Sequence, residues 1–339
     1  MKILIIRFSS IGDIVLTTPV VRCLKEQLGA EVHFLTKRNF EKILLSNPHI
    51  DRVFSIDKKV SEVLELLKNE GYDAVIDLHA NLRSLQVKLG LGVRSYSFDK
   101  LNFEKWLMTN LKINRLPPIH IVDRYLETVA PLGVKNDGKG LDFFIPKEDE
   151  IDVLTDEKGL IPSNFFKNGG SKYIAFVIGA AHATKRLPTG KIIDICNQIE
   201  LPIFLIGGKE DAERGELIVS KSTTYVVNLC GKLNLNQSAS IVRQTEKVIT
   251  HDTGLMHIAA AFGKDIISIW GNTIPEFGMT PYLPTASSQI IEVENISCRP
   301  CSKIGHDICP KGHFDCMNKM DILRIIKALS KPKNLKFKI

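Results

Sequence analysis

The stretch VITHDTGLMHIAAAFGKDIISIWG (248–271) contains a complete strand–helix–strand pattern. A β-branched run ends at His251, residues 252–254 make a turn, and residues 255–262 have the spacing of an amphipathic helix. The apolar run at 265–270 then predicts another strand. Strands joined by a helical crossover lie parallel, because the crossover returns the chain to the same end of the sheet. The segment therefore predicts an α/β fold with a parallel sheet.

The same alternation extends outward from this segment. Before it, three further runs read as buried strands: YIAFVIG (173–179), PIFLIGG (202–208) and VVNL (226–229). An earlier series has four such runs: KILIIR (2–7), EVHFLT (31–36), RVFSI (52–56) and AVIDL (74–78). The helices expected between the runs of this earlier series are 12–28, 40–45 and 60–70. Two βαβ series in succession predict two doubly wound, Rossmann-like domains.

A polar stretch separates the two series. Residues 147–172 are rich in charge, proline and glycine, which is typical of a linker. A chain of 339 residues also suits two domains better than one. We therefore predict domains at 1–165 and 166–339. Ligands of such sheets bind beyond the carboxyl ends of the strands, so we expect the site in a cleft between two facing domains.

Composition restricts the class of protein. The hydrophobic fraction of 44% and charged fraction of 24% are ordinary globular values. Arg7 interrupts the first apolar run, and no run reaches the length of a membrane-spanning helix, so we expect a cytoplasmic protein. The net charge is +7, but only 7% of residues are aromatic and no aromatic–basic stacking platform is visible, which disfavours nucleic-acid binding.

The first candidate site is the turn at Asp252, Thr253 and Gly254. The N-terminus of the following helix offers free N–H groups and a positive dipole, which suit a phosphate group. Gly254 allows close approach of an anion, and Thr253 adds a hydroxyl donor. His257 lies three residues further on and either points at the phosphate or packs in the core. The alternative for Asp252 or Thr253 is a simple helix cap.

Two other strand ends add charged groups. Thr184, Lys185 and Arg186 follow the strand at 173–179, but the loop lacks the glycine and hydroxyl positions of a P-loop, which disfavours an ATPase. Lys185 fits stabilisation of a diphosphate, or is a surface cation. Glu210 follows Gly207 and Gly208 and can accept hydrogen bonds from ribose hydroxyls, or simply favours a helix N-terminus.

The first strand of the chain also ends in a polar loop. Ser9, Ser10 and Gly12 lead into a helix, and the loop has one glycine where a dinucleotide fingerprint needs three, so an NAD site is not expected. Asp13 lies at the start of that helix. A carboxylate there can act as a general base on an acceptor hydroxyl, or serve only as a charge partner of the helix.

Four stretches in order resemble one known family. RFSSIGDIVLTTPVVRCLK (7–25), ATKRLP (183–188), GGKEDAE (207–213) and HDTGLMHIAAAFGK (251–264) are similar to the ADP-heptose:lipopolysaccharide heptosyltransferases of glycosyltransferase family 9. The resemblance implies a GT-B fold, a nucleotide-sugar donor and a lipid-linked glycan acceptor. It also implies inverting transfer of a heptose without a metal ion, and no Asp-X-Asp motif occurs in the chain.

The resemblance also assigns roles to residues. It implies that Asp13 is the catalytic base and that Lys185 stabilises the departing diphosphate. Thr184 lies beside Lys185 on the donor side, Glu210 binds the ribose, and residues 252–254 with His257 match the donor-phosphate motif. Ser9, Ser10 and Gly12 shape the acceptor-side loop. The acceptor itself and the sugar stay open, because departures from the family pattern concentrate in the N-terminal half.

Alternative functions remain at this stage. One is a GT-B enzyme that uses another sugar nucleotide or acts as an epimerase. Another is a non-catalytic nucleotide-sugar-binding protein, which the joint presence of Asp13 and Lys185 disfavours.

The segment CRPCSKIGHDICPKGHFDC (298–316) has a spacing compatible with structural zinc, although we favour reduced or locally paired cysteines.

Contact with an anionic membrane is expected at two places. One is the apolar–basic stretch around Phe103, Trp106, Met108, Lys112 and Arg115, and the other is the lysine-rich end at 319–339. For the second, an ordinary solvated terminus is the alternative.

Overall fold

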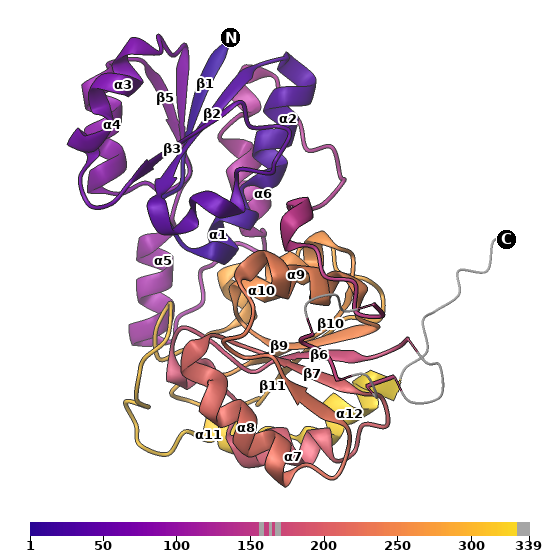
Figure 1. Cartoon of the computed structure of the whole chain (residues 1–339). Helices are drawn as coiled ribbons and strands as arrows, with labels where there is room; N and C mark the ends of the chain where they lie inside the picture. The colour runs from indigo at the N-terminus through magenta and orange to yellow at the C-terminus, as the bar shows by residue number, and fades with distance from the viewer. Residues whose placement is uncertain (156–158, 163–164, 167–170, 331–339) are drawn as a thin grey trace, which may run out of the picture. The chain divides into compact units, whose positions relative to one another are not determined.

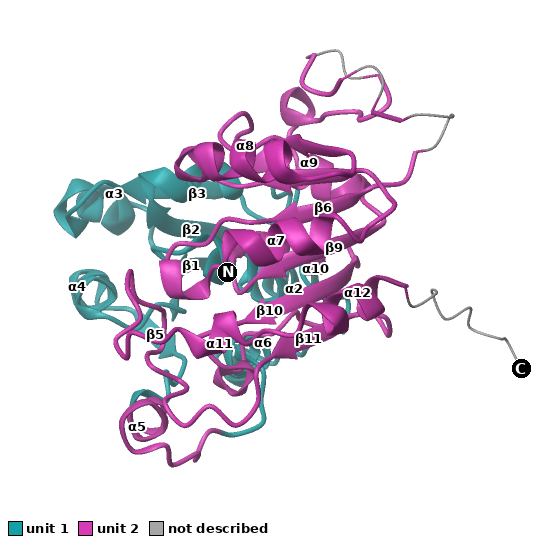
Figure 2. Cartoon of the chain, turned by 90° about the horizontal axis from the view of Figure 1, so that it is seen from below, with its two compact units in different colours: residues 1–102, 117–144 teal, residues 103–116, 145–339 magenta. Residues whose placement is uncertain are grey.

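The computed structural model describes residues 1–155, 159–162, 165–166 and 171–330. The chain divides into two compact units, which are residues 1–102 with 117–144, and residues 103–116 with 145–339 (Figure 2). Each unit contains one parallel sheet with helices packed against it (Figure 1). The predicted α/β class with two parallel sheets is therefore confirmed.

The first unit is built on a five-stranded sheet in the order β3-β2-β1-β4-β5. Its strands are β1 (Lys2–Ile6), β2 (Glu31–Lys37), β3 (Arg52–Ile56), β4 (Ala74–Asp77) and β5 (Arg94–Ser97). All neighbours are parallel. Four of the five strands match the predicted runs. The sequence RSYS of β5 has no apolar run, because this edge strand is mostly exposed.

Helices cover both faces of this sheet. They are α1 (Ile11–Val15), α2 (Thr18–Leu28), α3 (Leu64–Asn69), α4 (Leu82–Leu91) and α6 (Ile121–Glu127), with the 3-10 turns η1 (Arg38–Ile43), η2 (Val60–Glu62) and η4 (Ala130–Leu132). On one face, Leu67 of α3 and Val87 of α4 pack with Leu4, Ile6 and Val75 of the strands. On the other face, α2 packs against β2 and α6.

The helix predicted over residues 12–28 is divided in two. Pro19 has no N–H group, so it cannot donate to the carbonyl oxygen of Val15 as a helix requires. The hydroxyl of Thr18 donates to that oxygen instead, at 2.8 Å, and Thr17 donates similarly to the carbonyl of Ile14 at 2.7 Å. The chain therefore ends α1 at Val15 and begins α2 at Thr18.

The second unit is built on a six-stranded sheet in the order β11-β10-β9-β6-β7-β8. Its strands are β6 (Ile174–Val177), β7 (Ile203–Ile206), β8 (Val226–Asn228), β9 (Lys247–His251), β10 (Asp265–Trp270) and β11 (Gln289–Glu292). Alternate side chains of β6 enter different cores. Ile174 and Phe176 pack on one face, and Ala175 and Val177 pack on the other. Both faces of this sheet are therefore covered, as the continuous apolar runs predict.

The helices of the second unit are α5 (Asn102–Trp106), α7 (Thr189–Cys196), α8 (Ala212–Lys221), α9 (Leu235–Gln244), α10 (Gly254–Ala261), α11 (Asp315–Asn318) and α12 (Ile322–Ser330). Its shorter turns are the π-helical η3 (Leu107–Leu111) and the 3-10 turns η5 (Lys147–Asp149), η7 (Ala183–Lys185), η8 (Lys209–Asp211) and η9 (Pro275–Phe277). The strand–helix–strand pattern quoted first corresponds to β9, α10 and β10.

The stretch expected as a linker belongs in large part to the second unit. Ile151, Val153 and Phe165 are buried in its core, and the ring of Phe165 stacks on that of Phe204 with centroids 4.0 Å apart. The main-chain N–H of Ile151 also donates to Ser240 of α9 at 3.0 Å. Scattered apolar residues thus anchor a segment whose overall composition is polar. Along the chain, the last change from the first compact unit to the second comes at residue 145.

Candidate active site

An ion pair joins two strand ends of the second unit. Lys185 follows β6, Asp252 follows β9, and these two strands are neighbours in the sheet. The Lys185 Nζ lies 2.5 Å from Asp252 Oδ2 and 3.4 Å from the main-chain oxygen of the same residue. Thr273, just after β10, donates to the same Oδ2 atom at 3.0 Å. The predicted phosphate-binding residues Lys185 and Asp252 are therefore in direct contact.

Helix α10 begins immediately after this ion pair. Thr253 is its N-cap residue, yet the helix has no side-chain cap hydrogen bond, and the Thr253 hydroxyl lies 3.4 Å from that of Thr250. The carboxylate of Asp252 is directed to Lys185 instead of to the helix. The capping alternative thus does not describe these side chains, and the first turn keeps the positive end of its dipole available to an anion. His257, one turn into α10, is buried.

The ends of β6 and β7 approach each other around a buried carboxylate. Asp211 is 1% exposed, accepts from the main-chain N–H of Gly208 at 3.0 Å and lies 3.7 Å from Arg186. A Cβ atom on Gly179 would come within 2.3 Å of an Asp211 oxygen, so only glycine fits there. Asp211 therefore supports the loop, and its neighbour Glu210 is exposed and available to a ligand.

Thr184 is tied to the cysteine-rich segment. Its side chain is 2% exposed, and its hydroxyl donates to the main-chain oxygen of His306 at 2.9 Å and accepts from the N–H of the same residue at 2.8 Å. The main-chain N–H of Thr184 also donates to that His306 oxygen at 3.0 Å. These bonds fix the turn that carries Lys185.

A second ion pair ends the first strand of the other unit. The Arg7 guanidinium lies 2.6 Å from Asp13 Oδ1, while Ser10 donates to Asp13 Oδ2 through its hydroxyl at 2.6 Å and its main-chain N–H at 3.0 Å. Arg7 also donates to the main-chain oxygens of Ser9 and Leu78 and to the hydroxyl of Tyr125. Asp13 is thus held by its own loop and by a cation that the fold fixes.

His79 and Tyr125 surround this second pair with groups that are neutral at physiological pH. The His79 ring packs edge-on against Phe8, 5.2 Å between centroids. Burial, the positive charge of Arg7 and that of Lys100 lower the pKa of His79 to about 4. Burial raises the pKa of Tyr125 well above its ordinary value. Of these four groups, Asp13 and Arg7 are therefore the charged ones.

Comparison with known proteins identifies the family. Residues 60–310 match the model of glycosyltransferase family 9 (heptosyltransferase), which is more than half of the chain. The chain belongs to glycosyltransferase family 9. It is 28% identical to lipopolysaccharide heptosyltransferase 1 of Campylobacter coli, over 97% of this chain and 99% of that protein. The enzyme class expected from the sequence, a glycosyltransferase, is confirmed.

Solved structures agree on the fold of this family 9 glycosyltransferase. A family 9 glycosyl transferase from Veillonella parvula superposes with a TM-score of 0.75, at 22% identity over 97% of this chain and 96% of that one. The ADP-heptose LPS heptosyltransferase II of Escherichia coli gives 0.70, at 20% identity over 97% of each chain. The GT-B class predicted for this family 9 member is therefore confirmed.

Some residues of the site were not expected from the sequence of this family 9 enzyme. They are Arg7, His79, Asp211 and Thr273. Arg7 carried a usable signal, because a charge at the last position of a buried strand needs a partner. The others carried none, since their roles depend on residues that are distant in sequence or on the choice between the adjacent acids Glu210 and Asp211.

Potential metal ligands gather at one place in the described part of this transferase. Oxygen and nitrogen atoms of Glu31, His33 and Glu70 lie within 4.8 Å of one another. Lys2 and Arg52 form ion pairs with these carboxylates, so the group is an ion-pair network at the opposite ends of the strands. In the cysteine-rich segment, Cys298 Sγ lies 3.7 Å from His313 Nε2. Burial raises the pKa of Cys316 to about 12, as expected of a thiol packed in the core.

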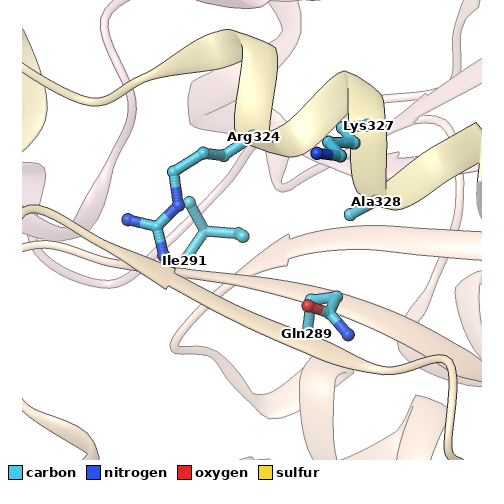
Figure 3. Close-up of a pocket in the computed structure, with 5 residues that line it drawn as sticks. All are labelled: Gln289, Ile291, Arg324, Lys327 and Ala328. Carbon is cyan, nitrogen blue, oxygen red and sulfur yellow. The ribbon is translucent and has the colours of Figure 1, made fainter.

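A cavity of about 250 Å³ lies elsewhere in the second unit. Arg324 of α12 reaches toward Ile291 of β11, and Gln289, Lys327 and Ala328 complete the lining (Figure 3). None of the predicted site residues lines this cavity. Within the described residues, no helix combines the length and apolar character needed to cross a bilayer. The lysines at 331, 333, 336 and 338, expected to contact a membrane, lie outside the described residues.

Proposed function

We propose that this glycosyltransferase moves a heptose from an ADP-sugar to the inner core of a lipopolysaccharide acceptor, with inversion and without a metal ion. The observation that carries the proposal is the Lys185–Asp252 ion pair beside the uncapped start of α10. This arrangement supplies a cation and a helix dipole where a diphosphate leaving group needs them. Similarity to proteins named as heptosyltransferases supports the choice of sugar and acceptor.

In this proposal, Asp13 accepts the proton of the acceptor hydroxyl while that oxygen attacks the anomeric carbon. The bond from the anomeric carbon to the diphosphate oxygen breaks, and its electron pair leaves with ADP. Lys185 and the start of α10 stabilise the added charge. Thr184, Thr253, Gly254 and His257 shape the donor side, Glu210 binds the ribose hydroxyls, and Ser9, Ser10 and Gly12 shape the acceptor side.

A donor screen tests the proposal. The protein is melted with ADP-, GDP- and UDP-sugars, and a ligand at 100 times its Kd should add about 2.7 kcal/mol of stability. ADP-sugars should give the largest shift, Lys185→Gln should lose most of it, and Asp13→Asn should keep it. Transfer should continue in EDTA. A preference for UDP-sugars with activity lost in EDTA, or consumption of donor without acceptor, contradicts the proposal.

We also propose that the enzyme works at the cytoplasmic face of a membrane, where a lipid-linked acceptor is anchored. The exposed rings of Phe103 and Trp106 support this, with Lys105 and Arg115 nearby in the sequence. Lys112 is not free for lipid, because its ammonium donates to the main-chain oxygens of Cys298 and Pro300 at 3.1 and 2.6 Å. That contact instead fixes η3 to the cysteine-rich segment.

A further inference from the structure

Helix α4 exposes a row of leucines. Leu82, Leu85 and Leu89 are 79%, 43% and 74% exposed, and their spacing of three and four residues puts them on one face. An amphipathic helix normally places polar side chains on its outer face. A contiguous apolar row that stays in water commonly marks an interaction surface.

The row contributes little to packing α4 onto its own unit. The inner side of the helix carries the buried Ser84 and Val87, and it packs beside α3 (Figure 1). A Cβ atom on Gly90 would come within 2.8 Å of Leu64 of the neighbouring segment, so the two helices are already in close contact. Folding of the unit therefore does not account for the three leucines.

A basic hollow opens along one flank of the row. It has a volume of about 550 Å³ and is lined by Lys58, Lys59, Arg83 and Gln86, among others. On a helix, Gln86 and then Arg83 lie next to the leucine face. Among the residues that the structure describes, no carboxylate forms an ion pair with these three cations. The nearby Glu62 instead accepts from the main-chain N–H groups of residues 57–59.

We propose that the leucine row of α4 and the cations Lys58, Lys59 and Arg83 form a docking surface for an anionic phospholipid bilayer. The inference rests on the proposed function, since a lipid-linked acceptor requires the enzyme to reach a membrane. Leucine side chains enter the interface between headgroups and acyl chains, and the cations contact lipid phosphates. Binding to a bilayer buries the exposed leucine side chains and pairs the three cations with lipid phosphates.

A second copy of this chain fits the same surface poorly. A twofold contact would place the row against itself and bring two sets of Lys58, Lys59 and Arg83 together. Without acidic partners among the described residues, these cations would repel one another across the contact. A bilayer with anionic headgroups carries the opposite charge. The chemistry therefore favours lipid over self-association.

Vesicle binding by the full-length chain tests the inference. Vesicles of phosphatidylcholine, with or without phosphatidylglycerol, are sedimented with the protein at low and high salt. The variant with Leu82, Leu85 and Leu89 all changed to Ser should bind anionic vesicles at least 100-fold more weakly at either salt concentration. The variant with Lys58, Lys59 and Arg83 all changed to Gln should lose about 100-fold at low salt, since each basic residue contributes about fivefold.

A matched control removes the same number of exposed leucines elsewhere. Leu45, Leu154 and Leu217 are 62%, 61% and 49% exposed on three different segments, and changing them to Ser should leave vesicle binding within about twofold. Melting temperature and ADP-sugar binding should match the unaltered protein in all three variants. The donor readout also separates this inference from the proposed function, because its donor residues lie in the second unit.

Three outcomes overturn the inference. One is that the α4 leucine variant binds vesicles normally while Phe103→Ser with Trp106→Ser abolishes binding, which locates the contact at residues 103–115. Another is that the α4 variant changes only the oligomeric state in analytical ultracentrifugation. The third is equal weakening by the control leucines. If the α4 leucine variant fails to fold, the Lys58, Lys59 and Arg83 variant decides by its loss of salt-dependent binding.

Discussion

Each unit has a lysine or arginine paired with an aspartate at the end of a strand, but the two pairs are held in place differently. In the first unit, Arg7 is 9% exposed and Asp13 is 20% exposed, so the carboxylate is the more accessible partner. In the second unit, Lys185 and Asp252 are 14% and 13% exposed. Exposure therefore distinguishes the two charges in the first pair but not in the second.

The hydrogen bonds of each pair show the difference. Arg7 uses its donors on Ser9, Leu78, Tyr125 and Asp13, so its position is set by the fold. In the other unit, Asp252 is held by Thr273, while Lys185 directs two contacts to Asp252 and an ammonium has three donors. We infer that Asp13 is the acting group of one pair and Lys185 that of the other.

The largest effect should follow from removing the acting carboxylate. Asp13→Asn keeps the size and the contacts with Ser10 but cannot accept the proton, so kcat should fall by about 10²-fold or more. The Kd of the ADP-sugar should stay unchanged. Steady-state kinetics with isothermal titration of the donor measures both. A variant with near-normal kcat would mean that Asp13 only pairs with Arg7 and the helix.

Removing the acting cation should have a different signature. Lys185→Gln should lower kcat/KM by about 10²-fold, the usual cost of losing one charge-stabilising donor, and should also weaken ADP binding. The matched control is Asp252→Asn, which keeps the lysine and should cost less. If Asp252→Asn proves as damaging as Lys185→Gln with ADP affinity intact in both, the pair is structural and another group stabilises the diphosphate.

Substitutions of Arg7 test whether its fixed position, in addition to its charge, affects catalysis by Asp13. A lysine cannot contact Ser9, Leu78, Tyr125 and Asp13 at once, so Arg7→Lys should lower kcat about 10-fold. Arg7→Gln should cost more and move the acid limb of the pH–rate profile to higher pH, because the carboxylate loses the cation that favours its charged form. Identical pH profiles in all three proteins would show that Arg7 only supports the loop.

Much of the fold follows from local pattern. Most of the runs that became strands, such as those of β1 and β6, are apolar and continuous, which is the signature of strands buried on both faces. The edge strands β5 and β11 and the helices α4 and α6 were not predicted. RSYS has no apolar run, and the exposed leucines of α4 hide the amphipathic period. In β5 and α4 the prediction failed because the element is not enclosed by the core, whereas α6 is largely buried and was missed all the same.

The residues of the site could be predicted from the sequence, but the contacts between them could not. A strand end followed by a polar turn marks Asp13, Lys185 and Asp252 from sequence alone. Lys185 and Asp252 are 67 positions apart, and their contact depends on β6 lying beside β9 in the sheet. Whether Glu210 or Asp211 enters the turn depends on the shape of the loop after β7, which no spacing rule supplies.

The smallest of these effects concerns stability, and it compares one histidine from each unit, the buried His251 and the partly exposed His79. His251 accepts the main-chain N–H of Leu187 at Nε2, 2.9 Å away, so the folded protein needs its neutral form. Burial and then Arg214 lower its pKa to about 3. Below the ordinary value of about 6.5, the unfolded chain binds a proton that the folded chain excludes. Stability should thus be full above pH 6.5 and fall as the pH drops toward 3.

Denaturant unfolding followed by tryptophan fluorescence measures this in the unit that contains His251, because Trp106 and the buried Trp270 both belong to that unit. Lowering the pH from 7.5 to 5.5 should cost about 1.4 kcal/mol through His251 alone, from one proton over one pH unit below its ordinary pKa. His251→Asn should remove that dependence, because an amide oxygen accepts from Leu187 without titrating. His79→Asn should change the Trp270 transition less, since His79 is partly exposed and lies in the other unit. If His251→Asn and His79→Asn reduce the pH dependence of the unfolding free energy equally, the acid sensitivity does not arise from the buried Nε2 acceptor of His251.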